Sequence, residues 1–382
     1  MTASTPRRRN IHREMHAAFV EHPNYQAVVQ EIEDALDLYE EDGEVATLPC
    51  IPVVGPSGVG KTTVFKQIKA AYPRVKDDRR VQMPDGTVII ADRVPLLCVT
   101  LPAARISVER LGREMLKELG DPHASLGKPE GLDERLDRLT RGCGVKGVLI
   151  DEGQRVVDRA GVLTAEKLID WIKDRHANNN ACFFLFGLNR MKPLFEQDGQ
   201  FDRRWDVELE MTPYVWGDDA DDDVSSRDAF IGLLAGLRAE SPVPFAEEVD
   251  VMDDETAKRF FYASRGLTGG LKKLLTRAMR IILARSREAG RAKPPPEPVI
   301  DLALLREAFD KAFRTQKANE RLINPFGPQW DGRLPPAIAE ENYVTATAKD
   351  KRRKDKLRRA RNTRDKSTKA ERKNALAEAL TK

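Results

Sequence analysis

Short apolar runs alternate with amphipathic segments through the first half of the chain. The apolar runs cover residues 48–54, 96–101, 146–151, 181–187 and 206–211, and segments with helical spacing cover 61–72, 107–119, 132–141 and 164–177. Runs that are apolar along most of their length suit strands buried on both faces of a parallel sheet. Their alternation with helices predicts an α/β fold with a doubly wound parallel sheet.

Changes in this pattern divide the chain into four parts. We expect an N-terminal helical segment over residues 1–45, an α/β domain over 46–216, a helical region over 224–322, and a flexible linker and basic tail over 323–382. One stretch interrupts the α/β alternation. Residues 81–90 place Asp85-Gly86 between two apolar strand-like pieces, which predicts an inserted β-hairpin.

Composition limits the class of protein. At 382 residues, with 41% hydrophobic and 33% charged residues, the chain can form two or three domains with a sizeable core. No run is long enough to span a membrane, and the Arg-rich start lacks the apolar stretch of a signal peptide. The cysteines are scattered without metal-ligand spacing, which favours reduced core thiols and a cytoplasmic protein.

Charge is distributed unevenly along the chain. Residues 349–382 contain 15 Lys and Arg against 5 Asp and Glu, a net charge of +10, so the rest of a chain of net charge +3 carries −7. A mildly acidic body with a basic tail favours an anionic polymer as partner. A solvated tail that only aids solubility is the alternative.

The run VVGPSGVGKTT at residues 53–63 is the most informative motif. It matches G-x-x-x-x-G-K-[ST] between a strand-like run and a helix, the context in which a glycine-rich loop turns its N–H groups toward phosphates. Lysine reaches the outer phosphates, and the next hydroxyl contacts Mg²⁺. The motif predicts a nucleoside triphosphate site formed by Gly55, Pro56, Ser57, Gly58, Val59, Gly60, Lys61, Thr62 and Thr63.

An acidic pair ends a neighbouring apolar run. The sequence KGVLIDEGQR places Asp151 and Glu152 directly after residues typical of a buried strand. P-loop enzymes need a carboxylate near the Mg²⁺ ion, and many place a second one where it orients the attacking water. We therefore expect Asp151 and Thr62 to hold Mg²⁺ and Glu152 to act in ATP hydrolysis.

Two basic motifs follow. Arg203 and Arg204 precede the last apolar run, where a ring-forming ATPase can present an arginine to its neighbour's γ-phosphate. In GLTGGLKKLL, Lys272 and Lys273 compete to reach the phosphates from the start of a helix, and their spacing after Gly270 favours Lys273. For the two arginines the alternative is a surface ion pair. For the two lysines it is an exposed basic face of a helix.

Together these runs resemble the AAA+ ATPases of the TniB/TnsC type, the target-selection ATPases of transposons, similar in role to MuB. The resemblance covers about residues 15 to 325 and rests on HPNYQAVVQEI, GPSGVGKTT, VTLPAARISVERLGREMLKELGDP, LIDEGQR, FFLFGLN, QFDRRWDVELEM and NPF. It implies an AAA+ P-loop NTPase fold with a parallel sheet, a small helical lid and a basic tail. The family roles it assigns are Walker A for Lys61 and Thr62, Walker B for Asp151 and Glu152, sensor 1 for Asn189, arginine finger for Arg204 and sensor 2 for Lys273.

The resemblance also implies a function. Family members use ATP and Mg²⁺ to assemble as rings or helical filaments on double-stranded DNA in the bacterial cytosol. They recruit a DDE transposase, in some cases through a target-site recruitment factor, and ATP hydrolysis disassembles the polymer. The family's DNA contacts correspond to Arg105, Arg110 and Arg113 here. A solvated helix face is the alternative for each of these arginines.

The sequence leaves two other functions open. Another DNA-loading AAA+ ATPase, such as an initiator or helicase loader, would be expected to carry a DNA-reading domain after the lid. Residues 291–382 look too short and too charged for one. A nucleotide-switched protein adaptor would bind no DNA, so the absence of DNA-stimulated ATPase activity would identify it.

Overall fold

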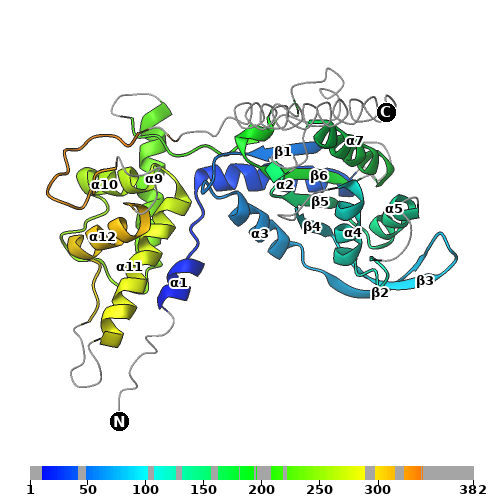
Figure 1. Cartoon of the computed structure of the whole chain (residues 1–382), viewed down its shortest axis with the longest axis horizontal. Helices are drawn as coiled ribbons and strands as arrows, with labels where there is room; N and C mark the ends of the chain where they lie inside the picture. Colours follow the sequence, from blue (N-terminus) through cyan, green and yellow to red (C-terminus); the bar gives the residue numbers. More distant parts are fainter. Residues whose placement is uncertain are drawn as a thin grey trace, which may run out of the picture.

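The chain forms an α/β body and a helical body that lie side by side (Figure 1). The computed structural model describes residues 11–41, 49–101, 107–125, 131–155, 162–179, 181–192, 195, 208–217, 222–288, 297–314, 322–336 and 338. The candidate site lies where the two bodies meet.

A five-stranded parallel sheet is the centre of the α/β body. Its strands are β1 (Cys50–Val54), β4 (Leu96–Thr100), β5 (Gly147–Asp151), β6 (Cys182–Gly187) and β7 (Leu209–Glu210). They lie in the order β4-β5-β6-β1-β7, and every neighbouring pair is parallel. The predicted fold class is therefore confirmed, and the carboxyl ends of all five strands meet at one edge.

Alternation along the strands explains why helices cover both faces of the sheet. Successive strand residues point to opposite faces, so fully apolar strands need cover on each side. One face packs against α2 (Pro23–Glu41) and α3 (Lys61–Ala71). The other packs against α4 (Val108–Leu119), α5 (Leu132–Gly142) and α7 (Val162–Asn179). Leu149 points to the first face, while Val148 and Ile150 point to the second.

The inserted hairpin is longer than its sequence pattern predicts. Strands β2 (Val75–Gln82) and β3 (Val88–Arg93) pair in antiparallel fashion, and the connecting turn lies at Asp85-Gly86 as expected. Gly86 has a φ of 82°, and the Asp85 carboxylate accepts hydrogen bonds from the Thr87 N–H and hydroxyl. Figure 1 shows the hairpin projecting from the end of the α/β body that lies away from the helical body.

Four helices form the helical body. They are α9 (Asp222–Ala239), α10 (Asp254–Ser264), α11 (Thr268–Glu288) and α12 (Leu302–Phe309), followed by a π-helical turn at Asp310–Arg314. Their apolar faces enclose an aromatic core that includes Phe230, Phe260 and Phe309, each with no exposed surface. This is the helical region that the periodicity predicts.

The two ends of the described chain pack onto these bodies. Helix α1 (Ile11–Ala17) places Met15 in the core of the helical body, whereas α2 belongs to the α/β body. The segment after residue 322 contributes to the helical body. Phe326 is buried against Phe260, with ring centroids 5.2 Å apart, because its aromatic ring completes the helical core.

The sequence analysis made expectations about the cysteines and about membrane-spanning segments. All four cysteines are buried and free. Within the described residues, no helix is long and apolar enough to cross a membrane. Residues 349–382, which form the basic tail, lie outside the described residues.

Candidate nucleotide-binding site

The P-loop turns tightly between β1 and α3. Gly58 and Gly60 have φ values of 86° and 124°, in the region where residues with a Cβ are strained. Gly55 approaches its neighbour so closely that a Cβ would lie 2.4 Å from the Met211 backbone oxygen. The glycines of the motif are therefore required by this backbone path, which leads directly into the first turn of α3.

Lys61 begins α3 and turns back over the loop. Its buried side chain donates hydrogen bonds from Nζ to the backbone oxygens of Gly55 and Pro56, at 2.7 and 2.8 Å. Burial lowers the pKa of Lys61 to about 8, although the carboxylates of Asp151 and Glu152 act in the opposite direction. The cation is thus held beside the loop, close to its titration range.

Asp151 and Glu152 lie at the end of β5. Asp151 is buried, and its Oδ1 accepts a hydrogen bond from the Glu152 N–H at 2.7 Å; burial raises the pKa of this aspartate. Glu152 has a φ of 63°, and its Oε2 accepts from Gln154 Nε2 at 3.0 Å and pairs with the Arg155 guanidinium at 2.9 Å. The carboxylate expected to orient water is therefore held in place by two neighbours.

The helical body touches the P-loop directly. At the start of α11, the Thr268 hydroxyl lies 3.0 Å from the Val59 backbone oxygen, and the Gly269 N–H donates to the Gly58 oxygen at 2.8 Å. A Cβ on Gly269 would lie 2.8 Å from that same oxygen, so only glycine permits this approach. Helix α11 is thereby fixed to the loop that is expected to bind phosphate.

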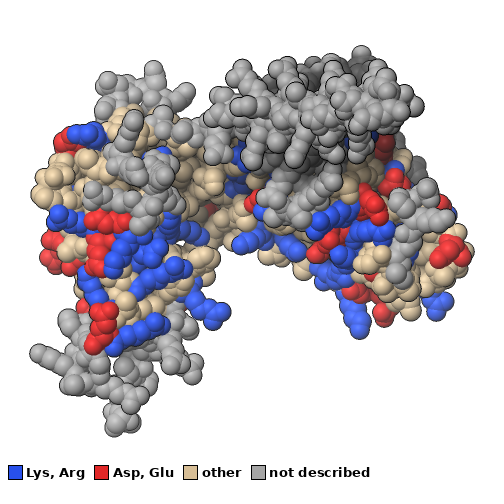
Figure 2. Space-filling model, in the orientation of Figure 1, with Lys and Arg blue, Asp and Glu red and all other residues tan. Residues whose placement is uncertain are grey.

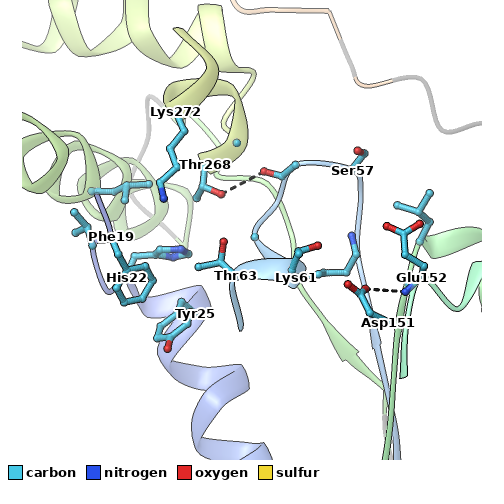
Figure 3. A pocket seen from close by; sticks show the side chains of 18 of the residues that line it. Phe19, His22, Tyr25, Ser57, Lys61, Thr63, Asp151, Glu152, Thr268 and Lys272 are labelled. Carbon is cyan, nitrogen blue, oxygen red and sulfur yellow. Dashed lines mark hydrogen bonds between the residues drawn. The ribbon is translucent and has the colours of Figure 1, made fainter. Parts of the chain in front are cut away.

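A pocket of about 350 Å³ lies between the bodies, and Figure 3 shows side chains converging on it from both. At one end are Lys61, Thr62 and Asp151. At the other are aromatic and aliphatic side chains from the segment before α2, from α2 itself and from α9: Phe19, Val20, His22, Tyr25, Leu233 and Leu237. A phosphate-binding end opposite an aromatic end fits a nucleoside triphosphate.

The histidine at the aromatic end of the pocket is uncharged at neutral pH. His22 is buried and shares a hydrogen bond of 2.8 Å between its Nδ1 and the Tyr214 hydroxyl. Burial lowers the pKa of His22 to about 4, so the ring is neutral under physiological conditions. A neutral aromatic wall suits the face of a purine base better than a phosphate.

The two lysines of α11 lie differently in the structure. Lys272 lines the pocket and points toward its interior in Figure 3, whereas Lys273 does not line it and places its Nζ 4.8 Å from the Phe313 ring centroid. The helix begins at Thr268, so Lys272 lies one turn further on the same face as the residue that touches the P-loop. Lys273 instead lines a neighbouring cavity with Ser57 and Gly58 of the P-loop, and its sensor 2 role stays a prediction.

Asn189 lies beside the P-loop and outside this pocket. The pocket is lined by Gly187 and Leu188, which end β6 and follow it, while Asn189 begins the next turn. Asn189 lines a separate cavity together with Pro56 and Arg265. Its sensor 1 role stays a prediction.

The arginines predicted to act as an arginine finger or to contact DNA differ in what the structure shows of them. Arg203, Arg204 and Arg105 lie outside the described residues. Arg110 is exposed near the start of α4. Arg113 pairs with Glu109 at 2.9 Å and donates to the Ala124 backbone oxygen at 3.2 Å, so its guanidinium ties α4 to the following turn.

The residues expected to hold Mg²⁺ fit that role. Thr62 is exposed at the start of α3, and the Asp151 carboxylate faces the same pocket. No group of three or more His, Cys, Asp or Glu side chains among the described residues could hold a metal ion. That is the pattern expected here, because Mg²⁺ at nucleotide sites takes one or two protein carboxylates and completes its shell with phosphates and water.

Sequence reasoning missed several residues of the pocket. Thr268, Gln154, Phe19 and His22 all line it, but none was assigned a role. The motif HPNYQAVVQEI contributes to the resemblance, and it marks the segment that supplies His22 and Tyr25. Their position opposite the P-loop depends on tertiary packing, which no local pattern encodes.

Comparison with known proteins identifies the fold. Residues 47–195 match the family model described as AAA domain, and no curated protein matches the chain. The structure is similar to the Aeropyrum pernix Orc1 protein in complex with DNA, with a TM-score of 0.51 and 16% identity over 81% of this chain and 70% of that chain. It is also similar to Cdc6p from Pyrobaculum aerophilum, with a TM-score of 0.51 and 13% identity over 78% of this chain and 70% of that chain.

These comparisons fix the fold class. At such low identities the two structures show the fold alone, and that fold is the AAA+ P-loop NTPase fold expected from the sequence. The AAA domain match covers the P-loop and the Asp151-Glu152 pair. Residues 47–195 accordingly form an AAA domain with this fold, which supports ATP binding and hydrolysis.

ATP affinity should fall as the pH rises through about 8. Phosphate stabilises the charged form of Lys61, so ATP binds most tightly while this lysine is protonated, and affinity should drop about tenfold for each pH unit above its pKa. Calorimetric titration of ATP from neutral pH to about pH 9.5 would measure this. Lys61→Arg is the control, because arginine stays charged and should show little dependence; a flat profile for the wild type would contradict the prediction.

Lys272→Ala should weaken ATP binding more than Lys273→Ala. Lys272 is the second lysine that lines the pocket, so its loss removes a charge-assisted contact to phosphate, an effect of about tenfold in Kd. Fluorescent nucleotide titration of both variants would compare them directly. An equal or larger effect of Lys273→Ala would contradict this prediction and favour the sensor 2 role predicted for Lys273.

Proposed function

We propose that this chain is an ATP-dependent, DNA-binding regulator of DNA transposition. It assembles on double-stranded target DNA and recruits or activates a DDE transposase, and ATP hydrolysis drives disassembly. The observation that carries the assembly step is the composition of the pocket. Its described lining contains Lys61 and Lys272 as cations but no arginine. An arginine from a neighbouring subunit, for which Arg204 is the candidate, would complete the set of charges for hydrolysis.

Sequence features support transposition and DNA as the setting. The motifs LIDEGQR, FFLFGLN and NPF resemble those of the TniB/TnsC type, and the tail of net charge +10 suits a polyanion. The Orc1 protein of similar fold is described in complex with DNA. Lys and Arg contacts to the backbone would accept many target sequences, since phosphates carry no base information.

The residues of the pocket divide the chemistry among them. The loop N–H groups and Lys61 hold the phosphates, while Thr62 and Asp151 hold Mg²⁺, which when bound neutralises charge on the outer phosphates. Glu152 orients the attacking water. Lys272 links the phosphates to α11, so the loss of the γ-phosphate weakens the attachment of the helical body to the P-loop. That loosening provides a route from hydrolysis to disassembly.

A second DNA-related function is favoured by the fold comparison. Initiators and helicase loaders share the AAA+ fold, and the two similar structures are named Orc1 and Cdc6p. In that case the chain would load another protein onto DNA and would recruit no transposase. Pull-down of a DDE transposase by the DNA-bound protein distinguishes the two functions.

Glu152→Gln tests the proposed cycle. The substitution keeps the size of the side chain but removes the carboxylate, so ATP should bind with near wild-type affinity, while turnover should fall about 100-fold or more. DNA-bound assemblies should therefore persist in ATP. Phosphate release and DNA co-sedimentation measure the two effects.

Glu118→Gln provides the matched control for that variant. Glu118 is exposed on α4, away from the pocket, and its variant should turn over ATP like the wild type. Rapid turnover by Glu152→Gln would remove Glu152 from its assigned role. Wild-type ATPase activity that DNA does not stimulate would instead favour a protein adaptor.

A further inference from the structure

A strongly basic groove runs beside the nucleotide pocket, between α3 and α11. It has a volume of about 660 Å³ and is bordered by α1 at one end. Lys66 contributes from α3, and Lys272, Lys273, Arg277 and Arg280 contribute from α11. No Asp or Glu is among the described residues that line it. We call this surface the basic groove.

The cations of the basic groove have no carboxylate partner among the residues that the structure describes. Within the described part of the chain, none of the five forms an ion pair with Asp or Glu. Lys273 lies over the Phe313 ring, and Arg280 Nε is 2.7 Å from His12 Nε2. Burial, and then repulsion from Lys66, lowers the pKa of Lys272. Such uncompensated like charges favour the binding of an anion.

These cations form a continuous stripe. On α11, residues 269, 272, 273, 276, 277 and 280 all line the groove, a spacing of three and four that puts them on one face. From Lys272 to Arg280 this face extends about 12 Å along the helix. Figure 2 shows Lys and Arg side chains gathered on the part of the helical body where Figure 1 places α11.

We propose that the basic groove binds the sugar–phosphate backbone of double-stranded DNA. This inference rests on the proposed function and names the surface that performs it. A duplex carries roughly seven phosphates along about 12 Å of its axis, which exceeds the number of cations on the stripe. Between the cations lie neutral donors of the kind that contact phosphate oxygens: Thr62, Thr63, Gln67 and Thr276.

The lining argues against an acidic protein segment as the occupant. Protein interfaces have an apolar, often aromatic centre from which charged residues are depleted. In the basic groove the apolar side chains are Ala17 and Phe19, and charge dominates instead. The lining therefore matches a backbone-reading surface, one that holds many DNA sequences alike.

The position of the groove links DNA binding to ATP. Phe19, Thr62, Thr63, Gly269 and Lys272 line both the pocket and the groove. When ATP holds α11 against the P-loop through Lys272, it also sets the separation between Lys66 on α3 and Arg277 on α11. DNA affinity therefore depends on the nucleotide state through the same helix.

The test is the full-length double variant Lys66→Ala/Arg277→Ala, which removes one cation from each wall. Neither side chain makes a polar contact within the described residues, so the fold should be unaffected. Fluorescence anisotropy with a random-sequence duplex and a non-hydrolysable ATP analogue should show affinity about 10- to 100-fold lower at about 0.1 M salt. The slope of log affinity against log salt should fall by about two.

Arg287→Ala is the matched control. Arg287 is exposed on the same helix but does not line the groove, and the basic tail is present in every protein compared. Its duplex affinity should equal that of the wild type. The anisotropy difference between the two variants then reports on the groove alone.

Four results would overturn this inference, and each contradicts a different claim. Wild-type protein that fails to bind the duplex rejects the proposed function itself. A double variant that binds like the wild type rejects the groove and leaves DNA binding elsewhere. Unchanged DNA affinity with lost self-association in sedimentation assigns the groove to a second copy of the chain. An equal loss of affinity for the ATP analogue assigns it to the nucleotide.

Discussion

The contact between the start of α11 and the P-loop is the constraint on which the functional geometry depends. The Gly269 N–H and Thr268 hydroxyl bond to backbone oxygens of Gly58 and Val59, and the closeness of Gly269 to Gly58 excludes any Cβ. This contact sets the rotation of α11. It therefore decides that Lys272 enters the pocket, and it places the basic stripe opposite α3. One short junction thus fixes two adjacent surfaces that carry lysines, the pocket and the basic groove.

The groups predicted to act in catalysis are held by partners within the chain. Lys61 donates to the carbonyls of its own loop, and Glu152 is held by Gln154 and Arg155. These contacts arrange the side chains before a nucleotide or a neighbouring subunit arrives, and they must be exchanged when phosphate enters. Turnover then depends on what displaces these partners, which is consistent with a site that a neighbouring subunit completes.

Local patterns were sufficient to predict the sheet and the phosphate end of the site. The five apolar runs became five parallel strands, and the P-loop and Asp151-Glu152 lie at one edge because parallel strands end together. Which lysine of α11 meets phosphate depends on the helical phase, which is set by where the helix starts, and Thr268 starts it through a contact 209 residues away in sequence. Phe19 and His22 were missed for the same reason, since the packing of distant helices places them opposite the loop.

Electron microscopy of the full chain with double-stranded DNA and a non-hydrolysable ATP analogue tests the central claim most directly. That claim is that ATP, bound between the two bodies, lets subunits assemble on DNA. The account predicts rings or helical filaments around the duplex with the analogue, and none without nucleotide. Dispersed monomers under both conditions would contradict it.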